Sequence, residues 1–460
     1  MTARPAQLLD SAPEAPADLA AVGESAVRIA MEAGADEAEA YLTRENYLTL
    51  VTRQNHPEKV ERAVVAGLGL KVYKGRRKAY VTGSAFGESA LREMARRALD
   101  YAVETTPEDA NRLPAEASGK SELVLFDESL AARTMEQKFA LLRRMEDAAY
   151  AADPRIKNTQ EASYWDGTFE KAHCNSNGLL SRERKTQCGL SLSVIAMSGD
   201  ERQVGGEYQA VRHFDRIDPE AAGREAARAA ARKLGARPVK SRHAPIVFDN
   251  RVGLRFLGYL IAAVNGERVA LNETFLAGKL GERIAPEHVH VMDEADRPGG
   301  YANAIVDGEG VRTANRRLIS GGVLTTYLHN LFSAQKLGAA LTGSVQRGSY
   351  EREGAIGAHN LYLAAGGLSR QQVIGSVGSG LLVTDLMGMG LTIANGNYSI
   401  GASGLWIEQG ELAHPVERVT IASNIRDMLL GIEEIGDDLR FWAGSGCPTF
   451  KIRQMAIGGE

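Results

Sequence analysis

The chain is poor in the features that assign a protein to a compartment or a partner at once. Three of its 460 residues are cysteines, too few and too scattered for a disulfide framework. No apolar run approaches the roughly 18–20 residues that cross a bilayer. The net charge of −4 gives no reason to expect nucleic acid or an anionic membrane as the main partner. We therefore expect a cytoplasmic protein that acts on neither.

The N-terminus, "MTARPAQLLDSAPEAPADLA", is rich in Pro and Ala and has no apolar segment of the kind found in signal peptides. Residues 1–17 are therefore predicted to form a flexible leader. The remaining chain is longer than one hydrophobic core usually supports, which predicts two or three domains. Hydrophobic residues make up 44% of the chain and charged residues 24%, as is ordinary for a globular protein.

The pattern of apolar residues changes twice along the chain. Residues 18–118 combine two amphipathic helices with alternating, strand-like segments and a hairpin, which predicts an N-terminal α+β domain. Residues 119–240 form a second α+β segment, whose Ala-rich last helix is expected to end with Gly235 as its C-cap. Residues 241–460 are dense in glycine, with short apolar runs between turns, and are predicted to be dominated by β-strands. The expected fold class is α+β.

The Ala-rich helix carries Arg224, Arg228 and Arg232 four residues apart, on one face. Such a face can bind nucleic acid. It is also typical of the solvated side of a helix whose alanines pack inward. We favour the solvated face.

The common cofactor and hydrolase motifs are absent. The glycine clusters "GSVGSG" (375–380) and "GLGLKVYKG" (67–75) lack the G-x-G-x-x-G spacing of dinucleotide sites. The segment "GASG" (401–404) has the wrong spacing for a nucleophile elbow, and there is no P-loop. These patterns give no support to a dinucleotide, nucleotide or serine-hydrolase site.

Metal-binding patterns are also weak. His288 and His290 would point to the same side of a strand and could share a metal, but no third ligand is evident, so we favour two polar positions on a half-exposed strand. Cys447 could be a ligand or a nucleophile, although a lone cysteine is more often a small residue in a turn. Three further candidates are isolated in the sequence: Asp385, His329 and His414.

The most specific signals are long, ordered stretches of sequence. In the C-terminal half they are "GKLGERIAPEHVHVMDE", "DGEGVRTANRRLISGGVLTTYLHNLFSAQKLG", "LLVTDLMGMGLTIANGNYSIGASGLWIEQGEL" and "PVERVTIASNIRDML". Near the N-terminus, "GADEAEAYL" and "GLGLKVYKGRRKAYV" belong to the same pattern. These stretches resemble the TldD/PmbA family, once described as modulators of DNA gyrase, and within it the PmbA-type, or TldE-type, subunits.

The resemblance implies a metallopeptidase assembled from two related subunits. In TldD-type subunits a helix carries H-E-x-x-x-H, and a later cysteine completes a zinc site with one position open for water. The metal lowers the pKa of that water, and the glutamate of the motif acts as general base. PmbA-type subunits share the fold without the motif. The pair encloses a cavity that admits unfolded or small peptides.

By this resemblance the metal motif should fall within "LGYLIA". Leu257 and Ala262 then occupy the histidine positions and Gly258 the glutamate position, and residues 244–287 contain no histidine at all. We expect no cofactor in this chain and zinc in the partner subunit. Cys447 lies near the position of the catalytic cysteine and is interpreted as a relic or a structural residue.

The resemblance also implies that a shared family motif lies close to the cavity between the subunits. Its residues line the peptide path or the interface, or simply form tight β-turns: Asn397, Tyr398, Ser399, Gly401, Ser403 and Gly404.

Three hypotheses for the function remain. The chain is a non-catalytic subunit that pairs with a TldD-like zinc peptidase, or a stand-alone peptide or amide hydrolase with a divergent site involving His288, His290 or Cys447, or a regulatory binding protein. We favour the first, with a TldD-like heterodimer partner, unfolded or small peptides as substrate, and a homodimer as a further option.

Overall fold

A computed structural model describes residues 18–115 and 118–460; the expected leader, 1–17, lies outside the described residues. The first half of the chain is built on one sheet of very long strands in the order β3-β2-β1-β5-β6-β4, with β7 pairing on β6. Its strands are β1 (Glu37–Arg53), β2 (His56–Lys74), β3 (Arg77–Gly83), β4 (Lys120–Leu125), β5 (Ile156–Asn175), β6 (Leu180–Ser198) and β7 (Glu201–Val211).

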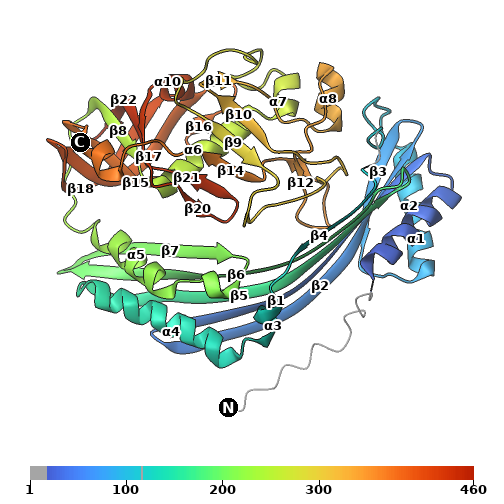
Figure 1. Cartoon of the computed structure of the whole chain (residues 1–460), viewed down its shortest axis with the longest axis horizontal. Coiled ribbons are helices and arrows are strands. Elements are labelled where there is room, and N and C mark those ends of the chain that lie inside the picture. The colour runs from blue at the N-terminus through green and yellow to red at the C-terminus, as the bar shows by residue number, and fades with distance from the viewer. Residues whose placement is uncertain (1–17, 116–117) are drawn as a thin grey trace.

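Two groups of helices pack on this sheet, each around a hydrophobic core of its own. Helices α1 (Leu19–Glu32) and α2 (Glu88–Val103) cover one end, and α3 (Glu128–Ala132), α4 (Met135–Ala152) and α5 (Pro219–Ala231) lie at the other (Figure 1). Because β1, β2, β5 and β6 run through both ends, the sheet is continuous across the predicted boundary at 118/119. That boundary stays a prediction.

The second half contains a small closed barrel. Strand β15 pairs with both β8 and β17, so the path β15-β8-β22-β18-β17 returns to its start. The barrel strands are β8 (Arg242–Phe248), β15 (Ser379–Met387), β17 (Asn397–Glu408), β18 (Glu411–Asn424) and β22 (Phe450–Gly458), with β16 (Leu391–Thr392) and β19 (Ile432–Ile435) attached. Closure leaves little exposed strand edge.

A second sheet has the order β11-β10-β9-β14-β21-β20. Its strands are β9 (Val291–Glu294), β10 (Arg316–Ser320), β11 (Val323–Leu324), β14 (Asn360–Leu363), β20 (Arg440–Trp442) and β21 (Ser445–Cys447), and β12 (Val345–Gln346) and β13 (Ala355–Ile356) form a separate ribbon. The helices are α6 (Asn250–Ala263), α7 (Gly266–Ala270), α8 (Leu331–Leu337), α9 (Arg370–Gly375) and α10 (Ile425–Leu430). Helix α6 contributes to the largest core, which joins barrel and sheet.

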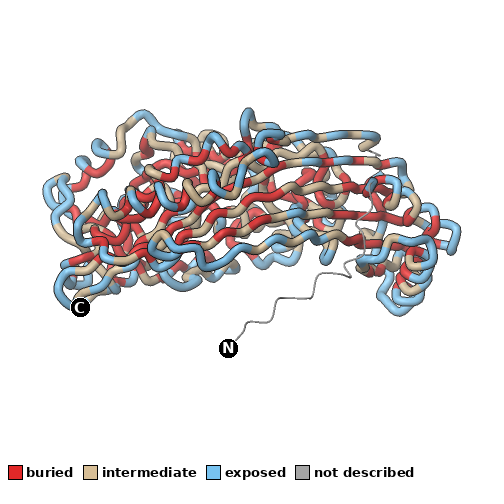
Figure 2. Tube along the Cα trace, turned by 90° about the horizontal axis from the view of Figure 1, so that it is seen from below, coloured by how far each residue is buried: buried red, intermediate tan, exposed pale blue. Residues whose placement is uncertain are grey.

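The C-terminal half lies on the concave side of the long curved sheet (Figure 1). Buried stretches are spread along the whole length of the molecule (Figure 2). The α+β class and the β-dominated C-terminal domain are as the sequence predicts. No helix among residues 18–115 and 118–460 is long and apolar enough to cross a bilayer.

The end of the Ala-rich helix differs from the prediction. Helix α5 stops at Ala231, and Arg232 rather than Gly235 is its C-cap. Gly235 has φ +78° and ends the turn that follows, where its N–H donates to the Glu201 carboxylate at 3.0 Å. The αL signal of Gly235 is therefore real, but it belongs to the loop.

Candidate functional site

Helix α6 is the element on which a metal motif would lie. Asp249 caps it, and the apolar face packs into the C-terminal core. Leu257 is fully buried, Gly258 is exposed with open space around its Cα, and Ala262 is half-buried. One of the three positions therefore faces the core, and none of the three carries a donor atom on its side chain.

The outer face of α6 holds a loop instead. Arg255 donates hydrogen bonds to the carbonyls of Leu386 and Gly388, and the Tyr259 hydroxyl donates to the carbonyl of Met389. The last residue of β15 and the start of the connection to β16, together called the Met387–Met389 loop, are thereby held beside the helix. Its two methionines point outward: Met387 is 52% exposed and Met389 82%.

The six predicted peptide-path residues lie on β17, the strand next to this loop. The Tyr398 ring meets that of Tyr259 edge-on, with centroids 5.8 Å apart, and Ser403 pairs with Asp385 across the β15–β17 ladder. Gly404 packs so tightly that a Cβ there would overlap the Leu382 carbonyl oxygen. Asn397 and Ser399 are exposed, and Gly401 pairs with Met387 of the Met387–Met389 loop. The structure therefore brings this segment and α6 together.

Cys447 also packs against α6, but not at the predicted motif. It is fully buried, and a Cβ built on Gly253 would lie 2.5 Å from its Sγ. Gly253 precedes Leu257 by about one helical turn and Ala262 by more than two. Burial, and then the charges of Asp438 and Asp249, raises the pKa of the Cys447 thiol well above its usual range. A protonated thiol is a poor zinc ligand and nucleophile.

The histidine candidates do not converge with it. His288 and His290 lie in the turn before β9, not on a strand, so the basis for a shared metal was wrong. His288 is exposed, and His290 Nδ1 accepts the Gly321 N–H at 3.1 Å. His329 is buried beside Ser333 with its pKa lowered by burial. His414 sits on β18 opposite Trp406.

Zinc does not fit these residues. A catalytic zinc needs about three protein ligands. Across the described parts of the chain, no group of three or more His, Cys, Asp or Glu side chains is placed to hold a metal ion.

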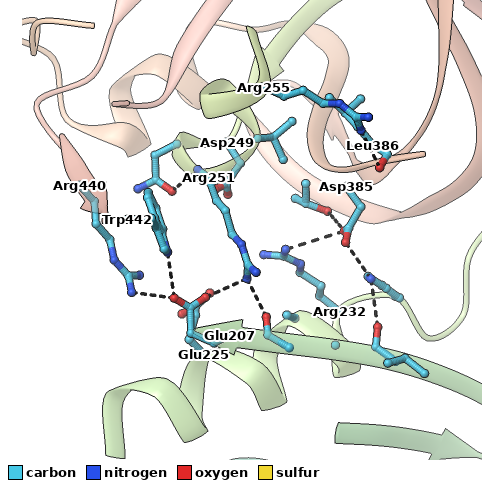
Figure 3. Close-up of a pocket in the computed structure, with 18 of the residues that line it drawn as sticks. Glu207, Glu225, Arg232, Asp249, Arg251, Arg255, Asp385, Leu386, Arg440 and Trp442 are labelled. Carbon is cyan, nitrogen blue, oxygen red and sulfur yellow. Dashed lines mark hydrogen bonds and ion pairs between the residues drawn. The ribbon is translucent and has the colours of Figure 1, made fainter. Parts of the chain in front are cut away.

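A cavity of about 510 Å³ opens between the middle segment and the N-terminal end of α6 (Figure 3). At one side lies Glu207 of β7, 3% exposed. Its carboxylate accepts bonds from Arg440 at 2.8 Å, from Trp442 Nε1 at 3.1 Å and from Arg251 at 2.9 Å. Three C-terminal side chains thus bind one buried acid of the middle segment.

Two more ion pairs line this cavity. Arg370 binds the α6 cap Asp249 at 2.8 Å, and Lys233 binds Asp385 at 2.9 Å. Arg232, which the sequence assigned to a solvated face, also lines it, while Arg224 and Arg228 are exposed as predicted. Of the isolated candidates, Asp385 alone belongs to the cavity.

A second cavity, about 460 Å³, lies where β2 meets the C-terminal half. Glu309 lines it and accepts the Leu331 N–H at 2.8 Å. Burial, and next the nearby Asp307, raise the pKa of Glu309 to about 7. This carboxyl therefore changes charge near neutral pH, a property that no local pattern in the sequence signals.

Comparison with known proteins places the whole architecture in one family. Residues 38–102 match PmbA/TldA metallopeptidase domain 1, residues 128–234 the central domain and residues 241–459 the C-terminal domain. Metalloprotease PmbA of Escherichia coli O157:H7 is 32% identical over 447 residues, covering 95% of this chain and 96% of that protein.

Solved structures share the fold. A putative modulator of DNA gyrase from Bacteroides thetaiotaomicron superposes with a TM-score of 0.87 at 24% identity, covering 96% of this chain and 98% of that one. TldE from Thermococcus kodakarensis superposes with a TM-score of 0.84 at 22% identity, covering 95% of this chain and all of that one (100%).

Proposed function

Because the chain belongs to the PmbA/TldD metallopeptidase family, we propose that it is the non-catalytic subunit of a two-subunit zinc peptidase. Its partner is a TldD-like subunit, which carries the zinc and the H-E-x-x-x-H helix. The substrates are unfolded or small peptides, and the pair works in the cytoplasm. This chain contributes part of the wall of the peptide cavity.

Helix α6 carries the proposal. At the motif positions it has Leu257, Gly258 and Ala262, and Leu257 is fully buried in the core. Apolar side chains offer zinc no electron pair. The outer face of the helix is engaged with the Met387–Met389 loop through Arg255 and Tyr259, so α6 acts as a support for that loop.

The exposed methionines and the outward residues of β17 are the part of this surface that meets peptide or partner. Met387 and Met389 are too exposed to serve the core of this chain, and flexible methionines suit contacts with varied apolar side chains. Asn397 and Ser399 extend the same side with polar groups. Obligate partners often bury more than about 2,000 Å², which a homologous subunit of this size can supply.

A stand-alone hydrolase receives no support from the placement of its candidate residues. His288 is exposed in a turn, His290 accepts a backbone N–H, and Cys447 is a buried thiol. The two histidines lie in the segment before β9, whereas Cys447 lies on β21 against α6.

Reconstitution tests the proposal. The chain, a TldD-like subunit from the same cell, and an equimolar mixture are each passed through size exclusion with light scattering and assayed on an unstructured peptide. We expect a stable mixed complex that cleaves the peptide, and no cleavage by this chain alone. Cleavage by the lone chain, or no complex at micromolar concentration, would refute the assignment.

A further inference from the structure

We propose that the cavity between the middle segment and α6 binds a carboxylate of the peptide substrate. The inference rests on the proposed function for the identity of the ligand as a peptide. The cavity has a volume of about 510 Å³, which lies in the range of ligand sites, roughly 300–1,000 Å³. It is formed by α5 and β7 on one side and by α6, β15 and β20 on the other (Figure 3).

Basic side chains outnumber acidic ones around this cavity, six to four. Each acid already has a basic partner within the chain. Glu207 is held by Arg251 and Arg440, and Asp249 by Arg370.

The other two acids are paired as well. Asp385 is held by Lys233 at 2.9 Å. Glu225 is paired at 3.6 Å with Arg228, which does not line the cavity. Of the lining bases, Arg255 forms no ion pair with a described residue, and Arg232 forms only a long one, at 3.9 Å to Asp385 (Figure 3).

Neither of these arginines has a full set of partners. Arg255 donates to two backbone carbonyls, those of Leu386 and Gly388, and a guanidinium has five N–H donors. Arg232 approaches Asp385 no closer than 3.9 Å. Among the described residues its buried Nε atom has no hydrogen-bond partner. In the view of Figure 3, Asp385 lies between the two.

A carboxylate is the anion that fits this arrangement. A guanidinium presents its donors in a planar fork that matches the two oxygens of a carboxylate. Arg255 also bonds the carbonyls on both sides of the exposed Met387, which directly follows the lining residue Leu386 in the chain. The site would take a peptide in which an apolar side chain lies next to the carboxylate.

Calorimetric titration of the isolated chain at low ionic strength tests this. The probe is an N-acetylated, unstructured hexapeptide that ends in leucine with a free carboxylate. Its C-terminal amide is the first comparison, and an amide with glutamate as its last residue is the second. We expect the free acid to bind at least tenfold more tightly than the leucine amide. If the glutamate amide binds, the site recognises side-chain carboxylates. If it does not bind, the site recognises the carboxylate at the C-terminus of a peptide.

Variants locate the site. Arg232→Gln should weaken binding of the free acid at least fivefold and leave the amide unchanged, while Arg232→Lys, which keeps the charge without the fork, should fall between. Arg224→Gln is the matched control, because Arg224 lies on α5, is exposed and does not line the cavity. Thermal melting confirms that each variant is folded.

Equal binding of acid and amides, or equal losses in the two Gln variants, would overturn the inference. The titration uses neither partner nor zinc. A failure here with intact cleavage by the reconstituted pair would therefore refute the carboxylate site and leave the proposed function standing.

Discussion

Two glycines of helix α6 should respond in opposite directions to replacement by alanine. Gly258 is exposed, and a Cβ there would meet no atom within 4 Å. Glycine within a helix costs about 0.5–1 kcal/mol relative to alanine, because it loses more conformational freedom on folding. Gly258→Ala should therefore increase the free energy of unfolding by about 0.5–1 kcal/mol.

Gly253 has no such room. A Cβ there would lie 2.5 Å from Cys447 Sγ and 3.0 Å from Phe450 Cε1, and both of those side chains are fully buried. Overpacking of a core costs about 1–3 kcal/mol, which exceeds the helical gain of about 0.5–1 kcal/mol. Gly253→Ala should therefore lower the free energy of unfolding by about 0.5–2 kcal/mol. Cys447→Ala in the Gly253→Ala background should recover part of that loss, because it removes the clashing sulfur.

Denaturant unfolding followed by near-ultraviolet circular dichroism measures both changes, and the midpoints are compared at constant slope. In the reconstituted pair, Gly258→Ala should leave peptide cleavage unchanged. The packing of α6 would be refuted if Gly258→Ala destabilised the chain, or if Gly253→Ala had no effect on it. A loss of cleavage in Gly258→Ala, with unchanged stability and assembly, would show that this helix takes part in the chemistry.

The remaining predictions concern the core, the thiols and pH. Leu260→Ala, at a position 1% exposed, should cost about 2–5 kcal/mol and leave cleavage by the assembled pair intact below the melting temperature. Cys447→Ser should keep that activity within a few-fold, and none of the three buried cysteines should react with a thiol reagent at pH 8 in the native chain. The pKa of Glu309 is raised to about 7 in the fold. Its protonated carboxyl therefore contributes stability that is fully present below the unfolded pKa of about 4.5 and is lost as pH rises through 7. Glu309→Gln should therefore raise the melting temperature at pH 8 relative to the unaltered chain, and not at pH 4.5; equal shifts at both pH values would contradict this.

Local patterns predicted the elements well where one segment decides the structure. The two amphipathic helices expected within residues 18–118 are α1 and α2, and the expected Ala-rich helix is α5. The turn glycine Gly235 was recognised, but the helix before it ends at Ala231, because the αL signal does not fix how many residues separate it from the last helical turn. The spacing of His288 and His290 puts both on one side only if they lie on a strand, and β9 begins only at Val291.

The cavity could not be predicted, because its partners are distant in the sequence. Glu207 is bound by Arg251, 44 positions later, and by Arg440, 233 positions later. No periodicity joins such residues; the closure of the barrel and the curvature of the long sheet bring them together. Arg232 shows the same limit. Its spacing from Arg228 indicates a shared helical face, but it does not reveal that Arg232, at the end of the helix, faces the C-terminal half.

Zinc analysis of the two subunits, purified separately and as a pair, tests the central claim most directly. Each sample is dialysed against metal-free buffer, analysed for zinc by mass spectrometry and assayed on the same unstructured peptide. We expect well under one zinc in this chain, about one in the TldD-like subunit and one per pair, with cleavage abolished by replacing either motif histidine of the partner. Stoichiometric zinc in this chain alone, or two zinc ions per pair with cleavage that survives the loss of the partner's histidines, would contradict the account.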